Sequence, residues 1–425
     1  MRPLVRSKSR LEPAPILVRL VDVNDLPTAI SSHREGGGRY AAARLFLLRN
    51  GVPVGDVIVP FSGPVLSAET IAKLVAAADG RGDSAVSTAR QPLPPGADRP
   101  FVSVVVASSF ARPAMLKRCV DALCAQDYPH YEILVVDNRP HRAVTRDLAA
   151  DLATMPRVRI ISEPRPGASA ARNRGYREAR GEIIAFTDDD TAAAPNWLTR
   201  LVDRFQREPD ADCVTGLVIP GELETPAQIW FEYSSSAFHQ RYEPASYGGG
   251  PYLIRNRLGP EPDRATPIYL VGDFGTGSNM AFRRAALQRL GGFDEALGPG
   301  TPAHAGEEIQ LFIRLLAAGG RLAFEPSMYV RHWHRRTVPE LVRQLRGYGI
   351  GFTAMLTATV VQQPHHLRGL LGLRRGAAQA PGRPARAEDE RFRPPKRLDL
   401  VRNASLMLGP AAYVWSRVRL RRWRR

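Results

Sequence analysis

The sequence of 425 residues predicts an α/β fold with a doubly wound, mostly parallel sheet. Continuous apolar runs indicate strands buried on both faces, and four of them occur at 101–108, 132–137, 158–162 and 182–187. Helical stretches separate these strands at 113–126, 141–153 and 168–180. Such alternation is typical of a parallel sheet whose two faces are covered by helices.

Two further units flank this sheet. The N-terminal part has the pattern of a small α+β domain, with two strands around an Asn50-Gly51 turn and a short helix in 67–78. Gly, Ser and Pro are frequent at 80–100, which indicates a linker. We therefore expect an accessory domain at 1–96, the α/β domain at 97–335, and a helical, linker and basic tail region at 336–425.

Composition limits the class of protein. An apolar share of 44% is that of a globular chain, and the length suggests two to three domains. Three cysteines without CxxC spacing argue against a disulfide framework and a structural zinc site. The N-terminal residues lack the apolar core of a signal peptide, and no run of eighteen apolar residues occurs. These features predict a cytoplasmic protein.

Positive charge is concentrated at the C-terminal end. Residues 366–425 hold sixteen Lys and Arg against four Asp and Glu, which accounts for +12 of the net charge of +17. Apolar stretches at 347–361 and 404–415 lie beside these basic clusters and are too short to cross a bilayer. The region is expected either to contact an anionic membrane surface or to form a packed helix with a basic end.

Three consecutive carboxylates follow the fourth predicted strand. Asp188, Asp189 and Asp190 repel one another at this spacing, and a divalent cation would relieve that repulsion. Carboxylate oxygens favour Mg²⁺ or Mn²⁺. Asp137 ends the second predicted strand and is expected at the same edge of the sheet, where ligands of such folds bind. The alternative is an acidic loop whose last residue caps a helix.

The loops between these acids limit which class of ligand the edge of the sheet can bind. The first strand is followed by ASSFARP at 107–113, which has no glycine, so a dinucleotide site of the GxGxxG type is not expected. A helix that begins near Gly167 points its N-terminal amides at the same edge, where Arg165, Arg172 and Arg174 add positive charge. Arg172 and its neighbour Asn173 are the strongest candidates for binding an anionic ligand.

Several motifs in order resemble the family 2 glycosyltransferases of the GT-A fold. They are VSVVVAS, QDYP, EILVVDN, the segment from Pro166-Gly167-Ala168 to Ala171-Arg172-Asn173, FTDDD and PNWL. The resemblance spans about 101–335, more than half of the chain. It implies a GT-A fold, which is a Rossmann-like α/β architecture, and a nucleotide-diphosphate sugar as donor.

The resemblance also implies positions for the donor, the acceptor and the catalytic base. The expected donor-binding residues are Ala107, Ser108, Arg112, Asp137, Arg172, Asn173, Asp188 and Asp189. Gly277 and Asn279 in GTGSNMAFRR are expected on the acceptor side. GEEIQLFIRL would supply the base, either Glu308 or Glu307, although the family usually has Asp at 308 and often an acid at 310, where this chain has Gln.

The segment MYVRHWHRRTV resembles the place where a histidine of this family joins the metal or the diphosphate. His332 and His334 are therefore expected, with Asp188 and Asp190, as metal ligands for Mg²⁺ or Mn²⁺. Trp333 would stack on a sugar of the acceptor or pack in the core. The QxxRW motif of processive synthases is absent from the sequence, so transfer of one or a few sugars is expected.

These observations predict a metal-dependent inverting glycosyltransferase of cell-envelope, polysaccharide or glycolipid biosynthesis, acting in the cytoplasm or at the inner membrane face. Its donor would be a UDP- or other nucleotide sugar, and its acceptor a carbohydrate or a lipid-linked molecule. No specific nucleic acid is expected as a partner. The alternatives are a catalytically silent relative and a basic protein that binds nucleic acid or anionic membranes.

Overall fold

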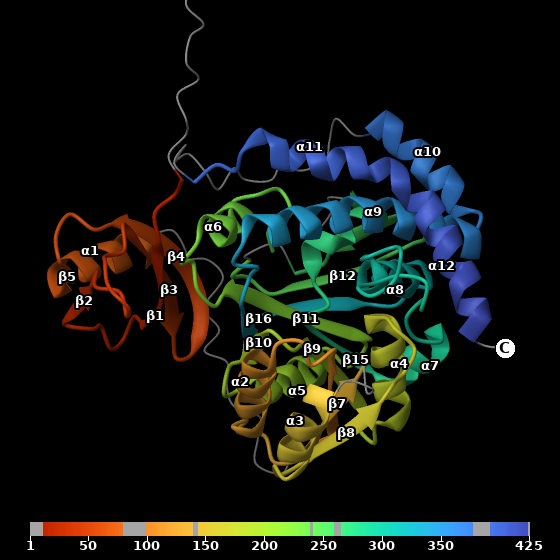
Figure 1. The fold of residues 1–425 in the computed structure, drawn as a ribbon, viewed down its shortest axis with the longest axis horizontal. Coiled ribbons are helices and arrows are strands. Elements are labelled where there is room, and N and C mark those ends of the chain that lie inside the picture. The colour runs from red at the N-terminus through yellow and green to blue at the C-terminus, as the bar shows by residue number, and fades with distance from the viewer. Residues whose placement is uncertain are drawn as a thin grey trace, which may run out of the picture.

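The protein is described by a computed structural model (Figure 1). The residues that it describes are 12–79, 99–138, 143–238, 241–258, 265–376 and 392–423. Most of the linker predicted at 80–100, and most of a second low-complexity stretch that begins at 377, lie outside these residues.

The central sheet begins with four parallel strands at the predicted places. They are β6 (Val102–Ser108), β7 (Tyr131–Asp137), β8 (Val158–Ser162) and β9 (Ile183–Asp188), in the spatial order β9-β6-β7-β8. Residues 102–106 of β6 are all buried, because neighbouring side chains alternate between two separate cores on the two faces of the sheet. The predicted α/β class is confirmed.

The second half of the sheet is mixed. β15 (Asn279–Arg283) lies antiparallel between β9 and β11 (Cys213–Pro220), and β11 pairs in parallel with β16 (Leu322–His332). The antiparallel strands β12 (Ala245–Gly249), β13 (Leu253–Asn256) and β14 (Ala265–Pro267) complete this side. The short strand β10 (Thr191–Ala193) pairs with the end of β16, and Thr191 lies opposite His332. This pairing brings the aspartate triplet beside the histidine pair.

Helices cover both faces of the sheet. One face packs against α2 (Pro113–Cys124), α3 (Ala143–Ala153) and α5 (Trp197–Arg207). The other packs against α4 (Ala168–Glu178), α7 (Arg284–Leu290) and α8 (Glu307–Ala317). Gly175 of α4 allows a close approach, because an added Cβ would overlap Val105 of β6. The start of α4 is thereby held at the carboxyl edge of the sheet.

The N-terminal residues form a separate three-stranded sheet of β1 (Ile16–Asp22), β3 (Ala42–Arg49) and β4 (Val52–Pro60). β3 and β4 form the hairpin predicted at Asn50-Gly51, whose φ angles of 54° and 74° suit these two residue types. A smaller pair, β2 (Ala29–Ser31) and β5 (Val65–Ser67), precedes α1 (Ala68–Asp79). This unit lies at the left in Figure 1 and contacts the large domain through the Ile16 amide, which donates to the Leu223 carbonyl.

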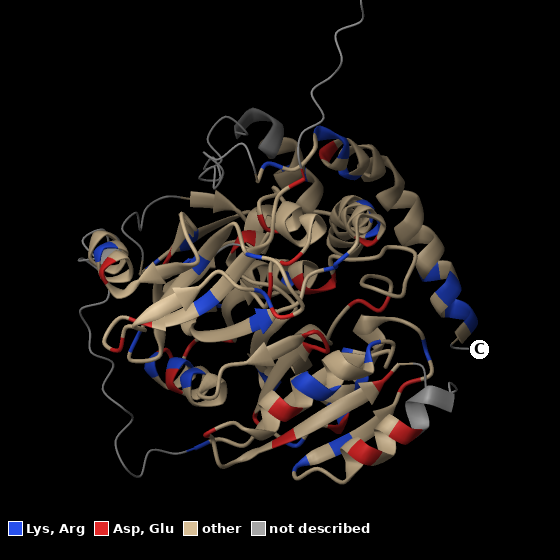
Figure 2. Cartoon of the chain, turned by 60° about the vertical axis from the view of Figure 1, so that its left-hand side comes forward, with Lys and Arg blue, Asp and Glu red and all other residues tan. Residues whose placement is uncertain are grey.

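The C-terminal residues are helical. α9 (Val338–Gln362) starts with a capping box between Thr337 and Glu340 and packs across α8. α10 (His366–Gly376) follows, and α11 (Lys396–Ser405), the 3₁₀ turn η3 (Leu406–Leu408) and α12 (Gly409–Trp423) run along α9. Lys and Arg gather at the last turns of α12 (Figure 2). Within the described ranges, no helix combines the length and apolar character needed to span a membrane.

Candidate active site

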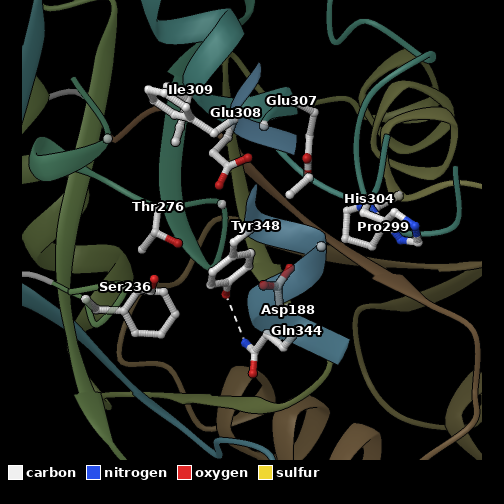
Figure 3. A pocket seen from close by; sticks show the side chains of 18 of the residues that line it. Asp188, Ser236, Thr276, Pro299, His304, Glu307, Glu308, Ile309, Gln344 and Tyr348 are labelled. Carbon is white, nitrogen blue, oxygen red and sulfur yellow. Dashed lines mark hydrogen bonds between the residues drawn. The ribbon is translucent and has the colours of Figure 1, made fainter. Parts of the chain in front are cut away.

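A cavity of about 1090 Å³ lies at the carboxyl edge of the parallel strands. Its walls come from the ends of β6 and β9, the start of α4, the segment before β15, the start of α8, and one side of α9. Figure 3 labels Asp188, Glu308 and Tyr348 among the side chains that line it. This is the place where ligands bind in open α/β sheets.

The three aspartates occupy different environments, which is how the fold accommodates them together. Asp188 is one-third exposed and accepts a hydrogen bond from Arg172 Nη2 at 2.8 Å. Asp189 accepts from the Ser108 hydroxyl at 2.6 Å, and Arg112 Nη2 lies 2.9 Å from both Asp189 and Asp190. Each carboxylate therefore has at least one hydrogen-bond donor or cation beside it, and Asp189 and Asp190 share Arg112.

These environments separate the pKa values of two of the carboxyl groups. Burial, together with the charge of Asp190, raises the pKa of Asp189 to about 6. Burial opposes ionisation of Asp190 as well, but His332, Arg112 and Arg335 outweigh it and lower its pKa to about 2. Asp190 is thus an ionised carboxylate at neutral pH.

Asp188, Asp190 and His332 form a group that can hold a metal ion. Each offers one ligand atom, and these atoms lie within 4.8 Å of one another. His332 Nε2 is 3.4 Å from Asp190 Oδ1, and burial lowers the pKa of His332 to about 4, so the imidazole is neutral as a metal ligand must be. Two carboxylates and one imidazole fit a divalent ion such as Mn²⁺ or Mg²⁺.

His334 is placed differently from the metal ligand expected at that position. It lies behind His332, with the two Nδ1 atoms 3.1 Å apart, and is outside the ligand group. Its Nε2 faces Glu232 Oε2 at 3.0 Å, at the end of α6 (Pro226–Glu232). The structure does not place His334 in the group of possible metal ligands, because its Nε2 faces Glu232 and its Nδ1 faces His332.

Two acids stand at the start of α8, opposite the aspartates. Gly306 precedes them with a φ of 94°, and an added Cβ there would lie 2.8 Å from the Gly351 carbonyl of α9. Glu307 is buried and pairs with Arg172 Nη1 at 2.6 Å. Glu308 points its carboxyl group into the cavity, and burial together with the charge of Glu307 raises its pKa to about 8 (Figure 3). Of the two acids, Glu308 is the one available to a substrate.

Most of the expected site residues line this one cavity, although their roles stay predictions. They are Ala107, Ser108, Arg112, Arg172, Asp188, Asp189, Asp190, Gly277, Glu307, Glu308 and His332. Asp137 is buried at the end of β7, and the adjacent Asn138 forms the wall there.

Three expected site residues have structural positions instead. Asn173 exchanges hydrogen bonds with the backbone of Phe293, which fixes the loop after α7. Asn279 accepts from Trp197 Nε1 at 2.9 Å and donates to two strand carbonyls, so its amide has no free group for an acceptor. Trp333 is buried against Gly221 and Arg118. None of these three side chains lines the cavity, so the structure does not support the expected ligand roles of Asn173 and Asn279, and the position of Trp333 agrees with the alternative of core packing.

One wall of the cavity was not anticipated from the sequence. Tyr348 is half-buried, desolvation raises its pKa, and its hydroxyl accepts a hydrogen bond from Gln344 Nε2 at 2.9 Å (Figure 3). Arg343 lines the same wall. The feature of the sequence that could have indicated this wall is the glycine spacing in GYGIG. Gly351 packs directly on Ala305, which brings α9 against α8.

Comparisons with known proteins agree with this site. The sequence model described as "Glycosyl transferase family 2" matches residues 103–291. A glucosyl-dolichyl phosphate glucuronosyltransferase of Haloferax volcanii is 26% identical over 54% of this chain and 68% of its own length. The succinoglycan biosynthesis protein ExoO of Rhizobium meliloti is 28% identical over 59% and 66%. A pre-mycofactocin glycosyltransferase of Mycobacterium tuberculosis is 26% identical, over 45% of this chain and only 36% of its own length.

Among solved structures, the mannosyltransferase PcManGT of Pyrobaculum calidifontis in complex with GDP-Man and Mn²⁺ aligns over 75% of this chain and 88% of its own. The TM-score is 0.43 at 18% identity. Three observations agree that this region is a glycosyltransferase. They are the match to the family model, the order of the strands in the sheet, and the relatives named as glycosyltransferases. Residues 103–291 match the model of the family 2 glycosyltransferases, and this part of the chain is a glycosyltransferase domain of that type.

Proposed function

We propose that this glycosyltransferase is metal-dependent and inverting, and moves a sugar from a nucleotide-diphosphate donor to a hydroxyl acceptor. One observation carries the proposal: the group of Asp188, Asp190 and His332 shares a cavity with the carboxyl group of Glu308. An inverting transfer needs a charge-neutralising site for the leaving diphosphate and a base on the opposite side of the sugar. The metal-binding group and Glu308 would meet these two needs within one cavity.

On the donor side, Asp188, Asp190 and His332 would hold Mn²⁺ or Mg²⁺, which neutralises the diphosphate as it leaves. Arg112 and Arg335 line the same region and would bind the remaining phosphate charge. Complexes of the similar PcManGT with GDP-Man and of GalNAc-T7 with UDP and GalNAc, each with Mn²⁺, name donors of this class. The base of the nucleotide would lie near Asp137.

On the acceptor side, Glu308 would accept the proton of the attacking hydroxyl group. The hydroxyl oxygen forms the new bond to the anomeric carbon while the bond from that carbon to the diphosphate oxygen breaks, so the configuration inverts. Arg172 would keep Glu307 paired, which leaves Glu308 as the acid that faces the substrate. A pKa near 8 makes Glu308 a stronger base than an ordinary glutamate.

The acceptor would be a carbohydrate or a lipid-linked molecule of glycolipid or polysaccharide biosynthesis, since relatives carry names from both. We extend the proposal to a cytoplasmic protein at the inner membrane face, where the C-terminal helices would contact anionic lipid.

The test is thermal stabilisation by nucleotide diphosphates with and without Mn²⁺. We expect stabilisation that needs Mn²⁺ and is lost in Asp190→Asn, whereas Glu308→Gln keeps it and loses sugar transfer. Asp121→Asn on the exposed face of α2 is the matched control and should behave as wild type. Binding that survives Asp190→Asn would overturn the metal site, and transfer that survives Glu308→Gln would overturn the role of Glu308. A silent relative would bind the donor and transfer no sugar.

A further inference from the structure

The C-terminal helices expose an apolar face to solvent. Among the described residues, large apolar side chains that are at least about 40% exposed are concentrated after Phe352, and only Val65, Leu253 and Leu258 lie elsewhere. Seven of them lie along 396–423, and the six before the terminal Trp423 recur at helical spacing: Leu400, Met407, Leu408, Val414, Trp415 and Val418. We call these six residues the outer stripe. Met407 is 84% exposed, an unusual position for a large apolar side chain.

Packing on α9 determines which face points outward. The opposite side of the same segment is buried, at Leu398, Ser405, Gly409, Tyr413 and Ser416. Gly409 leaves no room for a Cβ against Thr353 and Ala354 of α9. The Thr353 hydroxyl donates to the Leu406 carbonyl at 2.6 Å. Because these contacts fix the rotation of the segment, the outer stripe cannot turn inward.

Basic side chains accompany the outer stripe. Residues 392–423 contain eight Lys and Arg and a single acid, Asp399. Exposed examples stand at both ends, with Lys396 and Arg397 before the stripe, and Arg421 and Arg422 after it. A second copy of this chain docked on the stripe around a twofold axis would bring these like charges together. An apolar stripe between cationic ends instead matches the surface of an anionic bilayer.

The cavity lies next to this segment. Arg402, Asn403 and Leu406 line it, although they belong to α11 and η3, and the partly exposed Phe352 of α9 lies beside them. We propose that the outer stripe lies in the interface of an anionic membrane and holds the cavity beside the lipid surface, so that the acceptor is membrane-borne. The acceptor part of this inference rests on the proposed function; the binding of the stripe to lipid does not.

The experiment is co-sedimentation of the full chain with phosphatidylcholine vesicles, with and without phosphatidylglycerol. We expect binding to the anionic vesicles that weakens with salt and falls on the order of a hundredfold when Arg419, Arg421 and Arg422 are replaced by Gln. Met407→Gln combined with Trp415→Gln should weaken it similarly. Val65→Gln combined with Leu253→Gln removes two apolar side chains that are about half exposed elsewhere on the protein and should leave vesicle binding unchanged.

Three outcomes would overturn this inference: no vesicle binding, equal loss in the Val65 and Leu253 control, or a stable dimer whose formation depends on Met407 and Trp415. Mn²⁺-dependent stabilisation by nucleotide diphosphates without vesicles is measured in parallel. If that stabilisation is absent from the wild type while vesicle binding persists, the proposed function is wrong. The inference that the outer stripe binds an anionic membrane is then still supported.

A second inference concerns the N-terminal sheet, which reaches the metal group through a buried chain of contacts. Arg44 of β3 is fully buried, and its Nη1 lies 2.8 Å from Glu232 Oε1. The other oxygen of Glu232 contacts His334, whose second nitrogen faces His332. We infer that Arg44 is a positioning residue for the Asp188, Asp190 and His332 group.

The contacts determine where the ring protons lie. Glu232 accepts hydrogen bonds, so His334 donates from Nε2. When both rings are neutral, His334 Nδ1 is then an acceptor and His332 must donate from its own Nδ1. This leaves the lone pair of His332 Nε2 directed at Asp190 and available to a metal ion. Arg44 holds the Glu232 carboxylate in place through the contact of its Nη1 with Oε1.

The test compares Arg44→Met and Glu232→Gln with wild type, by ¹⁵N NMR of the histidine rings without metal and by Mn²⁺ affinity from electron paramagnetic resonance. We expect a changed tautomer and Mn²⁺ binding about 10–100-fold weaker, with partial rescue in Arg44→Lys. If Arg44→Met fails to fold, Glu232→Gln tests the same inference. Its side chain has only one oxygen for the two donors Arg44 and His334. Arg19→Met on the exposed face of neighbouring β1 is the control. Unchanged tautomers and affinity in folded variants would overturn the inference.

Discussion

Arg172 joins the two sides of the site, and its removal gives a sharp test of how charge is distributed there. Its side chain is 4% exposed and binds both Asp188 and Glu307, of which Glu307 is also only 4% exposed. Glu307 Oε2 has no hydrogen-bond partner among the described residues. Arg172→Met would therefore leave a buried carboxylate without its cation.

Breaking a buried ion pair from one side costs about 3–5 kcal/mol of the free energy of unfolding. Arg174→Met is the matched control in the same helix, since Arg174 pairs with Glu178 at the surface, where both side chains are more than one-third exposed. That change should cost less than about 0.5 kcal/mol. Arg172→Met with Glu307→Met should recover most of the loss, because no charge is then left unpaired.

Equilibrium urea unfolding, followed by tryptophan fluorescence and by circular dichroism, measures these differences where the two curves coincide. A loss below about 1 kcal/mol in Arg172→Met, or equal losses in Arg172→Met and Arg174→Met, would refute the reasoning. So would a double variant that is less stable than the single one.

Three further predictions follow from single residues. The pKa of Glu308 rises from 4.5 to about 8 on folding, so the free energy of unfolding of the wild type should fall as pH rises through this range. The urea midpoints of Glu308→Gln, measured against pH, should not show that fall. If the midpoints of the two proteins fell in parallel with pH, this prediction would be contradicted. Asn279→Ala should lower the free energy of unfolding in urea by about 3 kcal/mol, because buried carbonyls lose their hydrogen-bond donor, while the folded protein keeps its sugar-transfer activity; a stable variant that has lost transfer would return Asn279 to the acceptor side. Gly306→Ala should lower the free energy of unfolding by about 1–3 kcal/mol more than Gly319→Ala, because both glycines have positive φ but only Gly306 packs on α9. Equal shifts of the melting temperature in the two variants would show that the packing on α9 is irrelevant.

The sequence determined the parallel core and the position of the aspartates. Strand and helix periods, and the apolar runs of β6 to β9, depend on near neighbours along the chain, so they can be read locally. A carboxylate that follows a buried strand must lie at the edge of the sheet, and this placed Asp188 to Asp190 in advance. The acidic start of α8 was located only through the resemblance of GEEIQLFIRL to the family 2 glycosyltransferases.

Only the tertiary structure decided which polar groups face the cavity. Asn173, Asn279 and His334 have chemistry suited to a ligand, but carbonyls or acids brought in from remote segments occupy their hydrogen bonds. Arg44 and Tyr348 come from regions that carry no recognisable motif, and long-range packing brings them to the site. The outward face of α11 and α12 was likewise fixed by contacts with α9, because a helical pattern gives spacing around the axis but not which side meets the rest of the protein.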